Sequence, residues 1–231
     1  MEWPDYTLIS SLFPSFQNEN SGPTPFFEMD EPVWNILDPN SKNSLKSQLL
    51  DLLNSLNTSI KFEQVGITID DSKGPVVIDP SATIESSTHF IGPCYIGANV
   101  QIRHGAYIRE NSWICSDSLV GHCSEIKHSI LLPGSKAPHF NYVGDSILGK
   151  GVNLGAGVKL SNLRNDGTEV FLRVEGKRLA SGLRKFGAIL GEDCQLGCNS
   201  VTNPGTVLGS NSVVWPNITV TGVHPSQSSH R

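Results

Sequence analysis

Residues 134–145, GSKAPHFNYVGD, place Lys136, His139 and Tyr142 at intervals of three positions. The His139 imidazole is the candidate for proton transfer, because imidazole titrates near neutral pH and a positioned base accelerates a reaction by roughly 10²–10⁴-fold. The alternative is a loop histidine that only hydrogen-bonds to the backbone. The stretch therefore predicts either a general base or a structural histidine at position 139.

The histidines and cysteines lack the spacing of a metal site. Zinc-dependent carbonic anhydrases need three converging histidine ligands, whereas His122 and His128 are six residues apart and His104 has no suitable neighbour. The cysteines are odd in number and form no CxxC pair, which is typical of reduced thiols in a cytosol. We therefore expect no metal. The five cysteines are Cys94, Cys115, Cys123, Cys194 and Cys198.

The composition excludes several functional classes. A net charge of −5 and a pI of 5.8 do not attract nucleic acid. The N-terminus has no basic leader, and no run of eighteen apolar residues occurs along the chain. We therefore expect a cytoplasmic protein that binds neither nucleic acid nor a membrane.

A six-residue repeat runs through the chain from residue 78. Large apolar residues recur at every sixth position, and a small residue follows each of the first eight after four positions. This period fits neither a helix nor one long strand, but it fits short strands joined by tight bends, with one aliphatic and one small side chain per repeat pointing inward. It predicts an all-β fold, the hexapeptide form of a parallel β-helix. The first nine positions are Ile78, Ile84, Phe90, Ile96, Ile102, Ile108, Ile114, Val120 and Ile126.

Two stretches interrupt the repeat. Between residues 133 and 147 its phase slips by four residues, and residues 161–189 form an insert. We expect both to be loops on the binding face, where inserts in repeat folds usually lie. The second holds six of the 17 Lys and Arg residues, which indicates either a local anion site or a solvated hairpin. These six are Arg164, Arg173, Lys177, Arg178, Arg184 and Lys185.

Residues 1–75 differ in composition from the repeats in residues 76–231. The first thirty are rich in Pro, Ser and Asn, which predicts an irregular arm. An amphipathic helix with Asn40 or Ser41 as its cap follows, and its apolar face must pack on the end of the β-helix or on a neighbouring subunit. The leucines of that face are Leu45, Leu49, Leu52, Leu53 and Leu56.

With the repeat established, residues 134–162 resemble the signature of a known enzyme domain. This is the acetyltransferase domain of the bifunctional glucosamine-1-phosphate N-acetyltransferase/N-acetylglucosamine-1-phosphate uridylyltransferase, which carries K-A-x-H-x-x-Y-x-G-D followed by V-N-[IL]-G-A-G. The chain has KAPHFNYVGD and VNLGAG, and with EIK at 125–127 and IRHGA at 102–106 the similarity covers residues 78–222. The resemblance implies a left-handed coil, a homotrimer with sites between subunits, and acetyl-CoA as co-substrate. The family's uridylyltransferase domain has no counterpart here, so uridylyl transfer is not expected.

The resemblance also assigns the central roles. His139 would be the general base, and Arg103 and Lys127 would bind the phosphate of an amino sugar by charge-assisted hydrogen bonds. Arg103 and Lys127 are 24 residues apart, or one and a third coils, so they would lie on adjoining faces of one chain or meet across a subunit boundary. The alternative is two solvated surface cations.

Further contacts to the sugar and the coenzyme follow from the same resemblance. The alternative for the asparagines among them is a bend-forming role at a coil corner, and for Cys198 a merely small side chain at a bend. The implied contacts to the amino sugar and its acetyl group are Glu125, Tyr142, Asn153 and Asn162, and those to the coenzyme are Ala156 and Cys198.

The sequence as a whole predicts an N-acetyltransferase that acts on glucosamine 1-phosphate or a related amino sugar phosphate, in the biosynthesis of UDP-GlcNAc. Two alternatives stay open. One is a non-catalytic β-helix that serves as the partner or regulatory subunit of a separate sugar nucleotidyltransferase. The other is an acyltransferase with another acyl donor or with a nucleotide-sugar acceptor.

Overall fold

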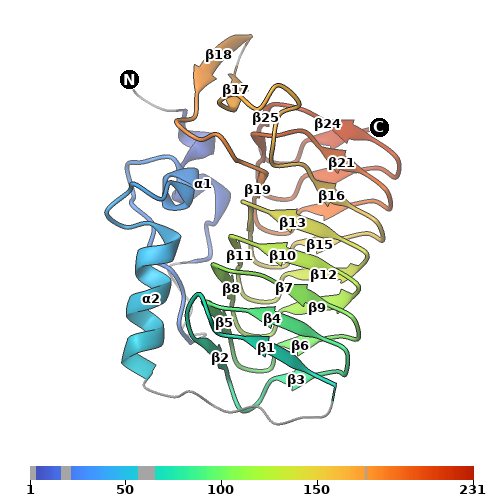
Figure 1. The fold of residues 1–231 in the computed structure, drawn as a ribbon. Coiled ribbons are helices and arrows are strands. Elements are labelled where there is room, and N and C mark those ends of the chain that lie inside the picture. The colour runs from blue at the N-terminus through green and yellow to red at the C-terminus, as the bar shows by residue number, and fades with distance from the viewer. Residues whose placement is uncertain (1–3, 17–21, 57–65, 175) are drawn as a thin grey trace.

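The computed structural model describes residues 4–16, 22–56, 66–174 and 176–231. In these residues the chain winds through three sheets in turn, each with eight short parallel strands, and the coils stack into a column (Figure 1). One antiparallel hairpin projects beyond the last coils. The arrangement confirms the parallel β-helix that the six-residue repeat predicts.

We name the sheets A, B and C in the order in which the chain visits them. Sheet A contains β1 (Thr68–Asp70), β4 (His89–Ile91), β7 (Tyr107–Ile108), β10 (Glu125–Lys127), β13 (Tyr142–Gly144), β16 (Lys159–Leu160), β21 (Val201–Thr202) and β24 (Thr219–Val220). Sheet B contains β2 (Val76–Ile78), β5 (Cys94–Ile96), β8 (Ser112–Ile114), β11 (Ser129–Leu131), β14 (Ile147–Leu148), β19 (Ala188–Leu190), β22 (Thr206–Leu208) and β25 (Val223–His224). Sheet C contains β3 (Thr83–Ile84), β6 (Gln101–Ile102), β9 (Leu119–His122), β12 (Lys136–His139), β15 (Asn153–Leu154), β20 (Gln195–Leu196), β23 (Val213–Val214) and β26 (Ser229–His230).

The other elements are the hairpin strands β17 (Phe171–Val174) and β18 (Lys177–Ala180), the helices α1 (Ile9–Leu12) and α2 (Leu45–Leu56), and the 3-10 helices η1 (Asp5–Thr7) and η3 (Val33–Leu37). Strand β1 pairs with β4, so the coils begin at Thr68, before residue 76, where the composition places the start of the repeats.

The interior of the coils is filled by the large apolar residues of the repeat. Parallel pairing aligns Ile84, Ile102 and Val120 in sheet C at intervals of 18 residues. None of the first nine repeat positions is more than 4% exposed. Burial of each such side chain contributes about 1.5–3 kcal/mol to the free energy of folding, so the stability of the column is spread along its length.

The expected loop at residues 134–145 is instead part of the regular coil. Lys136–His139 and Tyr142–Gly144 are strands of sheets C and A. The phase slips because two steps have five residues instead of six, at tight corners where His128 and Asp145 adopt φ angles of 45° and 48°. The inward side chains in this stretch, all fully buried, are Ile126, Leu131, Ala137, Val143 and Leu148.

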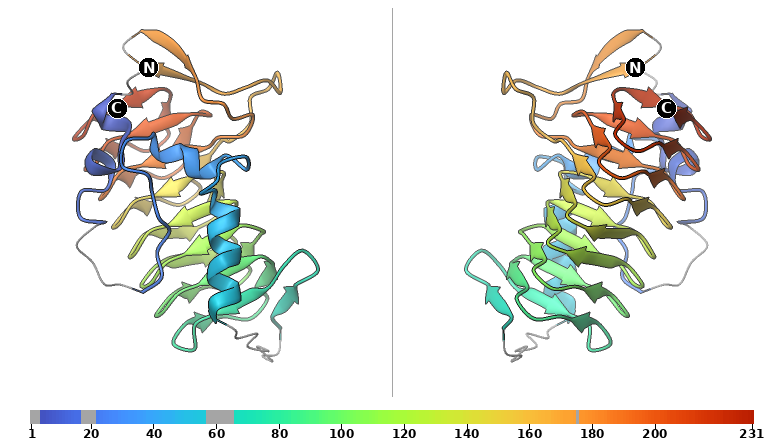
Figure 2. Two further views of the ribbon diagram at one scale, coloured as in Figure 1. Left: turned by 90° about the vertical axis from the view of Figure 1, so that its left-hand side faces the viewer. Right: turned by 90° about the vertical axis from the view of Figure 1, so that its right-hand side faces the viewer.

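The N-terminal arm packs along the outer face of sheet B. Figure 2 shows α2 lying against the side of the column, and not at its end as one expectation had it. Trp34 and Leu49 are buried there in one cluster with Tyr95 and Trp113, which lie one coil apart in sheet B. The helix cap is also different from the prediction, because the Ser44 hydroxyl accepts a hydrogen bond from the Ser47 N–H at 3.2 Å.

Polar contacts fix the arm at two corners of the column. The buried Glu192 carboxylate accepts hydrogen bonds from the N–H and hydroxyl of Ser15 at 3.0 and 2.9 Å, and burial raises the pKa of Glu192. His128 Nε2 lies 3.2 Å from the Leu37 carbonyl oxygen, to which a neutral imidazole donates. The arm is therefore an integral layer of the fold.

Strand β6 offers a direct test of the inward and outward positions. Ile102→Asp should prevent cooperative folding, because it places an unpaired carboxylate in the coil interior. Gln101→Asp, at the exposed neighbouring position, should change the free energy of unfolding by no more than about 0.5 kcal/mol. Urea unfolding followed by circular dichroism measures both, and equal midpoints would contradict the assigned register.

His128 should make the docking of the arm sensitive to pH. Burial lowers its pKa, against the opposing effects of Asp145 and Glu110. The unfolded chain therefore binds the proton first, so the stabilisation that neutral His128 provides is complete above about pH 6.5 and declines as the pH falls through the folded pKa. The free energy of unfolding should fall more between pH 7.5 and 5.5 in the wild type than in His128→Gln. Parallel losses in both proteins would argue against this role.

Candidate active site

Sheet A carries most of the polar side chains that could bind a small anionic substrate. It is bounded by two rows of corners: the C–A edge, where the chain enters from sheet C, and the A–B edge, where it leaves for sheet B. Three of its outward residues, Glu125, Lys127 and Tyr142, were predicted from the sequence, and Asn162 follows its strand β16.

Two cations lie in equivalent positions of adjacent coils on sheet A. Strands β7 and β10 pair Ile108 with Ile126, so Arg109 and Lys127 each come directly after an inward isoleucine and lie one coil apart on the A–B edge. Arg109 Nη1 donates to Glu125 Oε1 at 2.8 Å, and this hydrogen bond raises the pKa of Arg109. Sequence reasoning missed Arg109, although its spacing of one full coil from Lys127 was the available signal.

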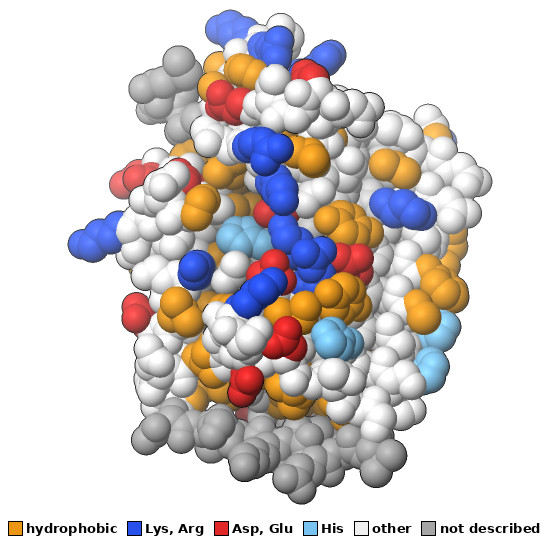
Figure 3. All heavy atoms as spheres, in the orientation of Figure 1, with side chains coloured by type: hydrophobic (Ala, Val, Ile, Leu, Met, Phe, Trp, Pro, Cys, Tyr) orange, Lys and Arg blue, Asp and Glu red, His pale blue; other side chains and the backbone are white. Residues whose placement is uncertain are grey.

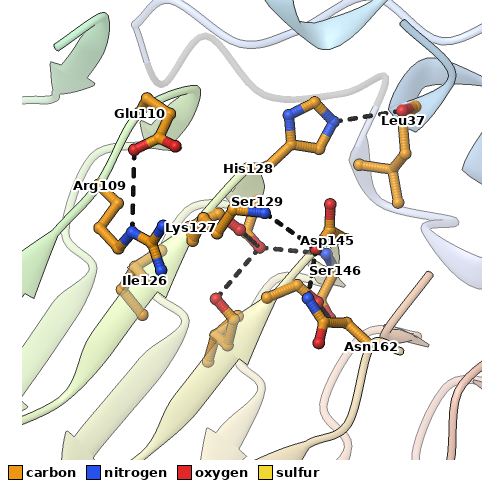
Figure 4. A network of polar contacts seen from close by, with 12 residues as sticks. Leu37, Arg109, Glu110, Ile126, Lys127, His128, Ser129, Asp145, Ser146 and Asn162 are labelled. Carbon is orange, nitrogen blue, oxygen red and sulfur yellow. Dashed lines mark hydrogen bonds and ion pairs between the residues drawn. The ribbon is translucent and has the colours of Figure 1, made fainter. Parts of the chain in front are cut away.

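Asp145 joins three successive coils at the same edge. Its carboxylate is buried, lies 3.4 Å from Lys127 Nζ and accepts a hydrogen bond from the Asn162 side-chain amide. Figure 4 shows Arg109 joined to Glu110, Asp145 joined to Asn162, and His128 pointing toward Leu37. Asp145 was not among the predicted site residues, but it contacts two residues that were predicted, Lys127 and Asn162.

Tyr142 lies across the adjacent surface of sheet A. Burial, followed by the charges of Glu125 and Asp145, raises the pKa of its phenol, which therefore keeps its proton at neutral pH. A Cβ atom at Gly144 would lie 2.6 Å from the Tyr142 hydroxyl and 2.8 Å from the Asn162 amide nitrogen. Only glycine at position 144 lets these two polar groups meet.

His139 lies at the C–A edge, on the other side of sheet A. Its exposed side chain ends β12, and its backbone N–H donates to Asn141 Oδ1 at 3.0 Å. Buried Asn141 in turn donates to the Gly155 carbonyl oxygen at 2.8 Å. The backbone of His139 is therefore fixed while its imidazole faces solvent.

The other predicted residues lie on or near the C–A edge. Arg103 follows β6, and Ala156 and Cys198 lie in the corners after β15 and β20, where the Asn199 N–H donates to the Ala156 carbonyl oxygen at 2.8 Å. Asn153 stands apart, because it is paired with Lys136 and Gln195 within sheet C. Apart from Asn153, a single chain thus gathers the predicted residues in two groups, one at each edge of sheet A.

The histidines, cysteines and carboxylates of the described residues do not cluster. Within the described ranges, no three His, Cys, Asp or Glu side chains are close enough to hold an ion. His104 and His122 instead stack at the C–A edge with ring centroids 5.6 Å apart. None of the helices in the described part of the chain is long and apolar enough to cross a membrane.

Two protein families match parts of the chain. Residues 90–176 match the family described as the GMPPB C-terminal domain, and residues 187–222 match the hexapeptide repeat of succinyl-transferase. The first match extends into the insert hairpin, the second begins after it, and together they cover most of the coils.

Two curated relatives are bifunctional proteins that match half of the chain or more. The bifunctional sugar-1-phosphate nucleotidylyltransferase/acetyltransferase of Sulfurisphaera tokodaii is 38% identical over 187 residues, which are 81% of this chain and 44% of that protein. The bifunctional protein GlmU of Methanococcus vannielii is 43% identical over 115 residues, or 50% of this chain and 28% of that protein. The chain thus spans less than half the length of these two relatives.

A third relative matches along nearly its whole length. The uncharacterized acetyltransferase YaiX of Escherichia coli O6:K15:H31 is 30% identical over 197 residues, which are 84% of this chain and 85% of that protein. The stacked six-residue coils and the match to a hexapeptide repeat agree with this similarity. The chain therefore belongs to the family of hexapeptide-repeat acyltransferases.

Proposed function

We propose that the protein transfers the acetyl group of acetyl-CoA to the amino group of glucosamine 1-phosphate or a related amino sugar phosphate. The observation that carries the proposal is the pair of cations, Arg109 and Lys127, at equivalent positions of adjacent coils on sheet A. The name of the Sulfurisphaera tokodaii relative, a bifunctional sugar-1-phosphate nucleotidylyltransferase/acetyltransferase, supports the same substrate class.

The phosphate of the acceptor would bind between Arg109 and Lys127. Carboxylates hold both cations in place, Arg109 through Glu125 and Lys127 through Asp145. A dianion would take over part of this pairing through charge-assisted hydrogen bonds, at a place where two cations are already oriented. The Tyr142 hydroxyl and Asn162 amide lie beside them and would hydrogen-bond to the sugar or its acetyl group.

His139 would remove the proton from the attacking amine. The neutral amine then forms a bond to the thioester carbonyl carbon, and the coenzyme leaves as a thiol after taking up a proton. An exposed imidazole on a fixed backbone suits this role, because the base must reach a substrate bound outside the coil. Ala156 and Cys198, in the next two coils along the same edge, would border the path of the coenzyme.

The strands of sheet A have two or three residues, so roughly 7–10 Å separate the two groups of site residues. A hexosamine phosphate has a comparable length, which would let the phosphate sit at the A–B edge with its amine toward the C–A edge. We propose that a homotrimer encloses this open surface and that Asn153 and Arg103 act toward a neighbouring subunit. We also propose a cytoplasmic location, which the five free cysteines support.

A thiol-release assay with a panel of amino sugars tests the proposed function. The wild type should release CoA with glucosamine 1-phosphate, and His139→Ala should lower the turnover by roughly 10²–10⁴-fold with little change in apparent substrate affinity. His122→Ala is the matched control, because His122 pairs with His139 in the preceding coil. No release with any acceptor would favour the non-catalytic alternative. Full activity of His139→Ala would support the acetyltransferase activity but exclude His139 as its general base.

The phosphate site has a separate kinetic signature. Arg109→Ala and Lys127→Ala should raise the acceptor KM by about 10–100-fold, since each removes a hydrogen bond to a charged group worth about 1.5–3 kcal/mol. The turnover number should change little, because phosphate contacts are made equally before and during the reaction. Arg103→Ala should affect KM less than either. A larger increase in KM for Arg103→Ala would indicate that the phosphate binds at the C–A edge instead.

A further inference from the structure

The insert in residues 161–189 is a folded hairpin anchored to the candidate active site. Strands β17 and β18 pair antiparallel, and the side chain of Leu172 in β17 is buried. The returning chain is fixed by two hydrogen bonds, from the Phe186 N–H to the Asn162 carbonyl oxygen at 2.9 Å and from the Gly187 N–H to the Asp145 carbonyl oxygen at 2.8 Å. The hairpin therefore leaves the column at the same A–B edge that carries Lys127.

A basic hollow of about 340 Å³ lies on this hairpin. The volume is that of a small ligand or of part of a larger one. In the part of the chain that the structure describes, Arg164 is the member of the lining that has an acidic partner, Asp166. Among the described residues, the lining contains four cations and one aromatic ring: Arg164, Phe171, Arg173, Gly176, Lys177 and Arg178.

One arginine in the hollow already forms a stacked platform. The guanidinium carbon of Arg178 lies 3.9 Å from the centroid of the Phe171 ring. A planar guanidinium with one face on an aromatic ring leaves its other face for a second planar group. The hollow thus combines donors for phosphate oxygens with a surface suited to a flat ring.

The cations on the hairpin repel one another, and a bound anion would reduce this repulsion. The chain as a whole has a net charge of −5, so acidic residues dominate elsewhere. Figure 3 shows basic side chains in a column from the hairpin down to the middle of this face. Arg184 and Lys185 continue the series, because they line a cleft of about 360 Å³ together with Asp145, the partner of Lys127.

We propose that the hairpin hollow binds the phosphates of a nucleotide, whose base stacks on the open face of Arg178. Arg173 and Lys177 supply the further charge-assisted hydrogen bonds to the phosphate oxygens. Two nucleotides have this chemistry: the 3′-phosphoadenosine diphosphate end of coenzyme A, and the diphosphate of a nucleotide sugar. The first source rests on the proposed function, whereas the second requires no acyl transfer.

Isothermal titration calorimetry on the full chain tests the site without any turnover. The probes are 3′,5′-ADP for the coenzyme and UDP for a nucleotide sugar. At least one should bind, and Lys177→Ala and Arg178→Ala should weaken it by about tenfold or more. Lys46→Ala is the control, because it removes an exposed cation on α2 and should leave binding unchanged. The probe whose affinity the hairpin variants lower identifies the source.

Arg178→Lys separates stacking from charge. It keeps the cation and loses the planar guanidinium, so it should weaken nucleotide binding more than it weakens the binding of inorganic phosphate. The proposal is overturned if neither nucleotide binds, or if the hairpin variants bind as tightly as Lys46→Ala. Binding of a single-stranded oligonucleotide, without binding of either mononucleotide, would also overturn it. Because these are equilibrium measurements, a failed thiol-release assay would leave their outcome unaffected.

Discussion

The stacking of parallel coils is the constraint on which the rest of this structure depends. Hydrogen bonds between adjacent strands fix each residue beside the one that lies one coil earlier, and buried aliphatic side chains hold the coils in that register. An outward side chain therefore has its neighbours set by the number of residues in a coil. Arg109 lies beside Lys127 because that coil has 18 residues. The next coil has 17, so Lys127 pairs with Gly144 and lies next to Asp145.

The number of residues in each corner between sheets A and B determines which side chains meet at that edge. The A–B corner at Asn111 has one residue more than the corners at His128 and Asp145. The short corners turn Asp145 inward under Lys127 and bring His128 against the arm. The same A–B edge then admits the long insert without disturbing the coils, since sheets A, B and C continue in register beyond it. The proposed phosphate contacts, the His128 contact to the arm and the basic hairpin thus share the A–B edge.

The sequence predicts the interior of the fold far better than its surface. Inward positions repeat with a fixed period, so Ile78 to Ile126 define the coil without further information. The two five-residue steps could not be distinguished from a loop, because Ala137 is a small inward residue and carries little signal. The docking of the arm was also hidden, although Tyr95 and Trp113 recur one coil apart outside the core. Arg109 was missed because a motif drew attention to Arg103, whereas coil arithmetic points to the residue 18 positions before Lys127.

The central claim is that coil register places the acceptor phosphate between Arg109 and Lys127. A crystal structure of the protein soaked with glucosamine 1-phosphate tests it most directly. The account predicts phosphate density within hydrogen-bonding distance of both side chains, with the Arg109–Glu125 contact of 2.8 Å weakened or broken. Phosphate density beside Arg103 at the C–A edge, with Arg109 still bound to Glu125, would contradict it.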